Sequence, residues 1–325
     1  MLIKDAGGEF ALIERLREIV PSRHPEVLVG IGDDAAVIRI NEGQNPFMLV
    51  TTDTLVADDH FNTRWAKPEQ IGIKTVECNV SDIAAMGGVP TFMFVSLVLT
   101  PETTLEWTEG LYRGMADSCG RHGVITAGGD TTHGKVETIS ITLLGRVSPE
   151  NLCLRSHAMP GYCIAVTGRL GASTAALNLL RKNLPVTSYL LEKHLTPRCR
   201  LDASQLLAPI VHAMIDISDG LASEVNHVCR QSGVGAEVFA KDIPLHPDVI
   251  DAGRTLGIPP ADFALNGGED FELLFTISPE NLYKLKQTGL SYYQVGRITD
   301  RGEAAFLVTE SGDKIPLKGG YNHFR

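Results

Sequence analysis

Hydrophobic and polar residues along the chain follow the two periods that distinguish helices from strands. Between Phe10 and Val20, apolar side chains recur at helical spacing, which predicts an amphipathic helix. Pro68 favours the first turn of a second helix, and the pattern extends that helix to Met86. Short apolar runs predict buried strands at residues 27–31, 47–56, 92–99, 124–127 and 138–147.

A connector with Pro149, Pro160 and Gly161 precedes a second stretch of alternating strands and helices. The pattern there predicts helices at residues 172–180 and 221–229, and strands at 162–167, 213–217, 271–277 and 293–298. A chain of 325 residues is also longer than one hydrophobic core usually supports. We therefore expect an α+β (mixed α/β) protein of two domains, residues 1–148 and 149–325.

Two local signals concern the first of these domains. Thr100 and Pro101 have the residue types of an N-cap and a first-turn proline, so a helix carrying Trp107 and Leu111 is predicted to begin there. The glycines that follow Ala127 predict a loop before the strand at residues 138–147.

Aspartate and glycine recur immediately after apolar strands. One aspartate at a strand end is common in turns, but carboxylates on several neighbouring strand ends would repel one another without a cation between them. Oxygen ligands that also bridge substrate phosphates indicate Mg²⁺. The segments are GIGDDAAV (30–37), LVTTDT (49–54), ITAGGDTTHG (125–134), MIDISDGL (214–221) and LNGGEDFEL (265–273), with NVSDIAAMGG (79–88) as a helical counterpart.

Composition narrows the class of protein. A net charge of −10 without a Lys/Arg run disfavours nucleic-acid binding. The cysteines form no C-x-x-C pair, which disfavours a zinc site or a disulfide framework. Neither a membrane-spanning apolar stretch nor a secretory signal is apparent, so we expect a cytoplasmic protein. Because the lysine-containing phosphate loop is also missing, aspartate-bound Mg²⁺ is the predicted means of holding ATP.

The ordered motifs GDDAAV, TTDTLV, NVSDIAAMGG, GGDTT, IDISDGL, GGEDFELLF and a terminal GY-x-HF resemble thiamine-monophosphate kinase. That family belongs to the superfamily of aminoimidazole-ribonucleotide synthetase and selenophosphate synthetase, and the resemblance runs from Gly8 to Phe324. It implies direct, Mg²⁺-assisted transfer of phosphate from ATP to thiamine monophosphate, giving thiamine diphosphate without a phosphoenzyme. It also implies a homodimer whose N-terminal sheets pair into a barrel, with the C-terminal domain completing the ATP and substrate site.

The resemblance further implies roles for individual residues. The positions that match Mg²⁺ ligands are Asp34, Thr51, Thr52, Asp53, Asp82, Asp130, Asp216 and Asp219. Those that match ATP contacts are Gly129, Asp130, Arg155 and Ser218. Those that match contacts to the thiamine substrate are His60, Glu269 and Tyr321. The residues expected to be catalytic are Asp130, Asp216 and Asp219.

Alternatives remain for individual residues and for the function of the protein. Arg155 has the features of an ordinary surface arginine, His60 those of a strand-edge histidine, and Tyr321 those of a packing anchor. The chain departs from the family pattern near the predicted substrate pocket, at Asp58, Asp59, Asn266 and Asn322. The rival functions are another ATP-dependent synthetase of the same superfamily and a non-catalytic ATP/Mg²⁺ sensor.

Overall fold

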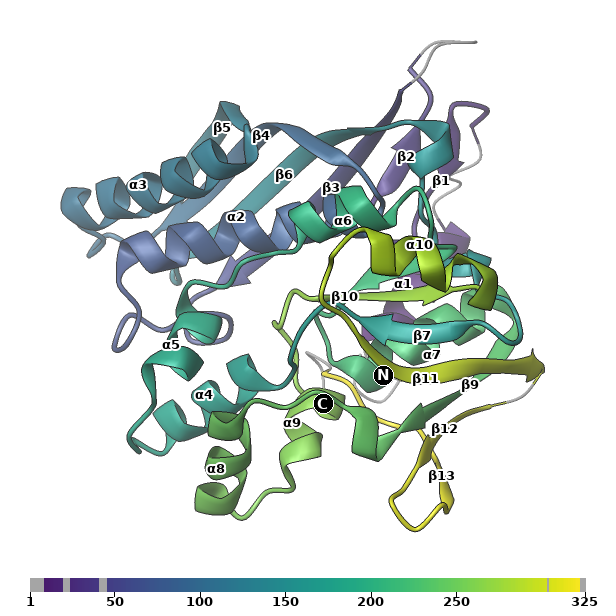
Figure 1. Cartoon of the computed structure of the whole chain (residues 1–325). Coiled ribbons are helices and arrows are strands. Elements are labelled where there is room, and N and C mark those ends of the chain that lie inside the picture. The colour runs from purple at the N-terminus through teal and green to yellow at the C-terminus, as the bar shows by residue number, and fades with distance from the viewer. Residues whose placement is uncertain (1–8, 20–23, 41–45, 303, 322–325) are drawn as a thin grey trace.

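Two β-sheets organise the chain (Figure 1). The computed structural model describes residues 9–19, 24–40, 46–302 and 304–321. The first sheet has the strand order β1-β2-β3-β6-β4-β5 and the second the order β13-β12-β9-β11-β7-β10-β8. The strands of the first sheet are β1 (Val27–Val29), β2 (Ala36–Ile38), β3 (Phe47–Val56), β4 (Val89–Leu99), β5 (Ile125–His133) and β6 (Thr138–Val147).

One face of the first sheet is covered by two helices that lie side by side, α2 (Pro68–Ala85) and α3 (Leu105–His122) (Figure 1). Alternate residues of β6, such as Ile139 and Ile141, are buried on this face because the side chains of a strand alternate between its two faces. The other face of the sheet is open, and Phe92 and Phe94 of β4 are exposed there.

Glycines bring α2 and α3 into backbone contact. A Cβ atom on Gly114 of α3 would lie 1.9 Å from the carbonyl oxygen of Glu69, and one on Gly72 of α2 would lie 2.1 Å from that of Leu111. No side chain fits at either position without moving a helix. The orientation of α2 is therefore set by its contact with α3 as well as by the sheet.

The second sheet is buried between helices. Its strands are β7 (Cys163–Val166), β8 (Ala213–Asp216), β9 (Val234–Phe239), β10 (Leu273–Ile277), β11 (Tyr293–Arg301), β12 (Ala305–Val308) and β13 (Lys314–Pro316). One hydrophobic cluster joins them to α7 (Leu221–Ser232), and another joins them to α6 (Leu201–Leu207) and α10 (Leu282–Gln287). A third cluster joins α4 (Ala172–Arg181), α5 (Ser188–Leu195), α8 (Pro247–Leu256) and α9 (Pro260–Asn266).

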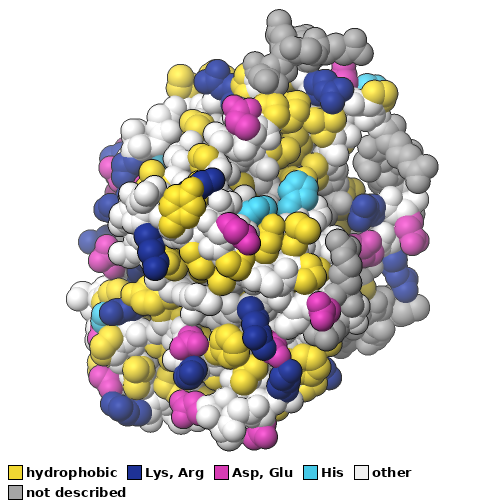
Figure 2. Space-filling view, turned by 45° about the vertical axis from the view of Figure 1, so that its right-hand side comes forward, with side chains coloured by type: hydrophobic (Ala, Val, Ile, Leu, Met, Phe, Trp, Pro, Cys, Tyr) yellow, Lys and Arg dark blue, Asp and Glu magenta, His cyan; other side chains and the backbone are white. Residues whose placement is uncertain are grey.

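The surface carries charges of both signs. On the face drawn in Figure 2, acidic and basic side chains are interspersed, and hydrophobic side chains gather near its upper part. Among the described residues, no helix is both long enough and apolar enough to cross a membrane.

Most predicted elements are confirmed. The strand predicted at residues 47–56 is β3, the helix predicted from Phe10 is α1 (Glu9–Ile19), and the helix predicted from Pro68 is α2. The mixed α/β content is confirmed as well. The division at residue 148 stays a prediction.

Two details of the first domain were wrong. Helix α3 begins at Leu105, and its N-cap is Thr104, whose hydroxyl accepts a hydrogen bond from the amide of Trp107. Thr100 instead donates its hydroxyl to Glu137, which holds residues 100–103 in a turn. The glycine-rich segment after Ala127 is not a loop, because it pairs with β4 as far as His133 and extends β5.

Candidate functional site

Three of the predicted carboxylates meet in space. Oxygen atoms of Asp34, Asp82 and Asp216 lie within 4.8 Å of one another. Asp34 lies just before β2, Asp82 lies near the end of α2, and Asp216 ends β8 of the second sheet. The cluster therefore joins the two halves of the chain.

Hydroxyl groups orient two of these carboxylates. Thr51 Oγ1 donates to Asp82 Oδ2 at 2.5 Å, and Ser81 Oγ donates to Asp216 Oδ2 at 2.7 Å. Burial, and then the neighbouring carboxylates, raise the pKa of Asp82 and the pKa of Asp216 well above the usual value. A cation at this position would remove that penalty.

Arg155 is a buried partner of the cluster and not an ordinary surface arginine. Its Nη2 lies 2.5 Å from Asp34 Oδ1, its Nε lies 3.2 Å from Asp34 Oδ2, and the side chain is 16% exposed. The guanidinium also lies 3.6 Å from Asp33. Arg155 reaches the first sheet from a short helical turn, Arg155–His157, that packs against α7.

A cleft of about 1010 Å³ lies next to the cluster and is lined by both halves of the chain. Asp53 lines this cleft. Burial, and in addition the charge of Asp34, raise the pKa of Asp53. Asp53 therefore lies both at the cleft and within electrostatic range of the cluster. Thr52, Ser218 and Asp219 line the cleft as well.

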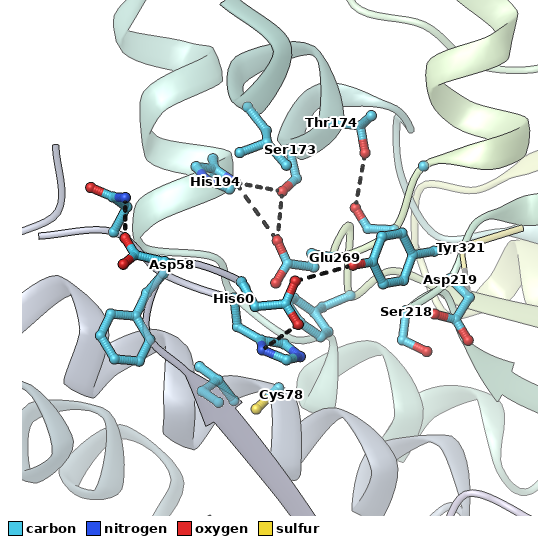
Figure 3. Close-up of a pocket in the computed structure, with 18 of the residues that line it drawn as sticks. Asp58, His60, Cys78, Ser173, Thr174, His194, Ser218, Asp219, Glu269 and Tyr321 are labelled. Carbon is cyan, nitrogen blue, oxygen red and sulfur yellow. Dashed lines mark hydrogen bonds and ion pairs between the residues drawn. The ribbon is translucent and has the colours of Figure 1, made fainter. Parts of the chain in front are cut away.

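The three predicted substrate residues line the same cleft, at the end shown in Figure 3. Tyr321 donates its hydroxyl to Asp59 Oδ1 at 3.4 Å, and Asp59 Oδ2 lies 3.6 Å from His60 Nδ1. Glu269 lies near them, with its carboxylate turned toward Ser173 and His194 (Figure 3). Asp59, a departure from the family pattern, thus connects Tyr321 to His60. Gly8, Asn322, His323 and Phe324 fall outside the described residues.

The segment that carries Glu269 has an unusual backbone. Glu269 has a φ of 64° and Phe271 a φ of 49°, in the left-handed region that non-glycine residues seldom adopt. The amide of Glu269 donates to the carbonyl of Ser218 at 2.8 Å. A Cβ atom on Gly268 would lie 1.9 Å from that carbonyl oxygen, so glycine is required there. These contacts fix Glu269 against the segment after β8.

Gly129 and Asp130 lie apart from the other predicted residues within one chain. Both belong to β5, the edge strand, whose nine residues are all exposed. Asp130 is paired in register with Ser96 of β4. The same row of the sheet continues with Ser140 of β6 and ends at Thr54 of β3. With about 4.8 Å between strands, Asp130 is about 14 Å from β3. Its row includes exposed Ser96 and Thr54, on the face away from α2.

Sequence reasoning missed three residues that surround Glu269: Lys74, Ser173 and His194. Lys74 lies on α2 and ion-pairs with Glu269, and Ser173 and His194 approach the same carboxylate from α4 and α5. One signal was available. Lys74, Cys78 and Asp82 are spaced by four residues, which places a lysine, a thiol and a predicted metal ligand along one face of a single helix.

Comparison with known proteins identifies the family of this chain. A family model described as "AIR synthase related protein, N-terminal domain" matches residues 32–147, and its C-terminal counterpart matches residues 159–309. A thiamine-monophosphate kinase of Bacillus subtilis (strain 168) is 35% identical over 316 residues, which cover 93% of this chain and 95% of that protein. The chain belongs to the thiamine-monophosphate kinase family.

Further members of the thiamine-monophosphate kinase family match over nearly their whole length. The Escherichia coli (strain K12) protein is 34% identical, covering 98% of this chain and 99% of that one. A solved structure described as "AaThiL complexed with AMPPCP and TMP" superposes with a TM-score of 0.88 at 31% identity, covering 99% of both chains. The fold and the family expected from the sequence motifs are thereby confirmed.

Proposed function

We propose that this protein transfers the γ-phosphate of ATP to thiamine monophosphate, forming thiamine diphosphate and ADP. The observation that carries the proposal is the nearly full-length match to thiamine-monophosphate kinases, combined with a cleft that adjoins a carboxylate cluster. The solved relative described as a complex with AMPPCP and TMP supports the choice of both substrates. The predicted thiamine contacts, His60, Glu269 and Tyr321, all line that cleft.

The residues fit Mg²⁺, and we infer that several ions bind here. Carboxylates packed within 4.8 Å of one another, with pKa values raised by burial, are costly without a cation. Asp34, Asp82 and Asp216 would hold ions at the cluster, with Asp53 and Thr51 beside them and Thr52 and Asp219 at the cleft wall. Mg²⁺, when bound, neutralises charge on the transferred phosphate.

In the proposed reaction, an oxygen of the thiamine phosphate forms a bond to the γ-phosphorus while the bond from that phosphorus to the β-phosphate oxygen breaks. The attacking phosphate is already anionic at neutral pH, so no strong general base is needed. His60, Glu269 and Tyr321 orient the acceptor, and Ser218, Gly129 and Arg155 contact ATP. Holding both phosphates in line supplies most of the rate enhancement.

We also infer a homodimer in which the first sheets of two chains pair into a barrel. β5 has an unpaired edge, which natural proteins seldom leave free. Among the described residues, β2 pairs with β3 only at Met48–Val50, so the edge of β3 from Thr51 to Val56 is also open. Exposed Phe92 and Phe94 lie on the face that the barrel would enclose.

Pairing of β5 with the open edge of β3 in a second copy supports a role for Asp130. Such pairing would bring Asp130 of one chain close to Thr52 and Asp53 of the other. The predicted metal and ATP contacts of Asp130, which one chain alone separates from the cluster, would then be made across the dimer.

We propose residues 1–148 as the metal-binding and dimerisation domain and residues 149–325 as the domain that completes the substrate site. The six cysteines are free thiols, as is usual in a reducing compartment. Together with the use of ATP, this favours the cytoplasm as the site of the reaction.

A coupled assay of ADP formation across acceptors tests the proposed function. We expect thiamine monophosphate, but not free thiamine, selenide or formylglycinamidine ribonucleotide, to accelerate ADP release in the presence of Mg²⁺. Thiamine diphosphate should form in a one-to-one ratio with ADP, measured by chromatography. Equal acceleration by another acceptor, or ATP binding without turnover, would support one of the rival functions instead.

A further inference from the structure

We propose that Lys74, assisted by Ser173 and His194, is a positioning residue that fixes Glu269 and His60 for binding of the phosphate acceptor. The inference rests on the proposed function, because it takes Glu269 and His60 as contacts of thiamine monophosphate. Lys74 is 4% exposed and does not line the cleft formed by the described residues. It therefore acts through the two residues that it holds.

Lys74 contacts two segments at the acceptor end of the cleft, the end lined by His60, Glu269 and Tyr321. Its Nζ lies 2.6 Å from Glu269 Oε1, and the same group donates to the backbone carbonyl of His60 at 2.9 Å. Glu269 comes from the loop before β10, and His60 from the loop after β3. One ammonium group thus sets the separation between two segments that are far apart in the sequence.

The other oxygen of Glu269 is held by a relay from α4 and α5. Ser173 Oγ donates to Glu269 Oε2 at 3.4 Å and lies 2.9 Å from His194 Nδ1. His194 Nδ1 also lies 3.7 Å from Glu269 Oε2, so the hydroxyl and the imidazole face the same carboxylate oxygen. Figure 3 shows Ser173 and His194 beside the carboxylate, on the side away from Tyr321.

The charges around Glu269 favour its ionised form. Burial alone would raise the pKa of Glu269, but interactions with its neighbours, of which the Lys74 ammonium is the largest, together outweigh burial and lower that pKa. Burial and Lys74 lower the pKa of His194 to about 4, so His194 is neutral at neutral pH. The other titratable groups facing this carboxylate are His60, Cys78 and Tyr321. A fixed carboxylate favours an acceptor that carries positive charge, as a thiazolium ring does.

Helix α2 connects the Lys74–Glu269 pair to the carboxylate cluster. Lys74 and Asp82 are separated by eight positions on the same helical face, about 12 Å at 1.5 Å per residue. A rigid helix that bears both Lys74 and Asp82 sets the distance between the acceptor ring and the transferred phosphate. The acceptor end can still be weakened by itself, because no described contact joins Lys74 to the cluster.

Substitution Lys74→Met, which removes the charge at similar size, tests the proposal by steady-state kinetics with both substrates varied. We expect the KM for thiamine monophosphate to rise about 10- to 100-fold, the range for a lost charged hydrogen bond. The kcat and the KM for ATP should change less than about threefold, because only acceptor binding is affected. The matched control Lys286→Met, at an exposed position of α10, should behave as the wild type.

A double-mutant cycle separates positioning from a general structural effect. In a Glu269→Gln background, Lys74→Met should raise the KM much less than in the wild type, because one of the two groups that it positions is already changed. The KM of Lys74→Met should also rise as the pH falls toward 6, while that of the wild type stays nearly constant. A parallel loss of ATP affinity, or full additivity with Glu269→Gln, would overturn the proposal.

The milder Ser173→Ala variant provides a second test of the proposal if Lys74→Met does not fold. It removes one donor to Glu269 and should raise the KM for the acceptor about threefold or more, without changing the KM for ATP. An unchanged KM for the acceptor would overturn the proposal. If the wild type itself does not phosphorylate thiamine monophosphate, the proposed function fails first, and the two failures are thereby distinguished.

Discussion

We expect each carboxylate of this cluster to lower the stability of the metal-free protein and to support its activity. Asp216 is 2% exposed and within 4.8 Å of Asp34 and Asp82, and its pKa is raised by burial and by Asp34. The same crowding that makes the metal-free site unfavourable would favour a divalent cation bound there. Loss of one carboxylate should therefore relieve strain and remove function together.

Asp216→Asn is expected to stabilise the metal-free protein by about 1–2 kcal/mol, measured by urea unfolding in EDTA at pH 8. Its amide oxygen can still accept from Ser81, so the fold is kept. Turnover with saturating Mg²⁺ should fall at least about 100-fold. Asp262→Asn, at an exposed position of α9, should change neither quantity appreciably. A less stable Asp216→Asn protein would contradict the repulsion that we infer.

Helix α2 positions residues at both ends of the site. It carries Lys74, Cys78 and Asp82 on one face and is held against α3 by backbone contact at Gly72 and Gly114. Such contact leaves no room for adjustment, because the neighbouring atoms are backbone and not flexible side chains. The packing of two helices thereby sets the distance between the acceptor pocket and the cluster.

Two glycine-to-alanine substitutions in α3 should have opposite effects. Gly114→Ala places a Cβ atom 1.9 Å from the Glu69 carbonyl oxygen, so we expect a loss of about 1–3 kcal/mol in unfolding free energy and reduced activity. Gly120→Ala meets nothing within 4 Å and should gain about 0.5–1 kcal/mol from helix propensity alone. Chemical denaturation of both variants measures the contrast, and equal effects would refute close helix packing.

Asp130 lies apart from the other predicted metal ligands within one chain, and the inferred dimer accounts for this separation. Asp130 is on the edge strand β5, while Asp34, Asp82 and Asp216 lie together on the other side of the sheet. The inferred barrel would bring them together across two chains, because β5 and part of β3 each leave an edge open among the described residues. A complete site then requires a dimer.

Heterodimers purified with two different tags test this arrangement. A dimer of one Asp130→Asn chain and one Asp216→Asn chain should keep about half of the wild-type activity, because one of its two sites is intact in a twofold assembly. A dimer of Asp82→Asn and Asp216→Asn chains should be inactive, since both changes damage the cluster of their own chain. Activity in neither heterodimer would place Asp130 in the site of its own chain.

The sequence by itself determined the local elements and the family. The periods of apolar residues predicted β3, α1 and α2, and the ordered motifs indicated the kinase family without a structure. Local patterns failed where neighbours decide the outcome. The segment 128–133 reads as a loop from its glycines, yet it forms a strand because β4 offers it hydrogen-bond partners.

Only the tertiary structure decided which of the candidate residues act together. Asp34, Asp82 and Asp216 meet because two sheets and α2 converge at one point, which no spacing in the sequence encodes. The Lys74–Glu269 pair was missed for the same reason, since ion pairs between distant segments leave no periodic signal. Short-range order follows from local chemistry, whereas a site is made by contacts between segments that the chain brings together only on folding.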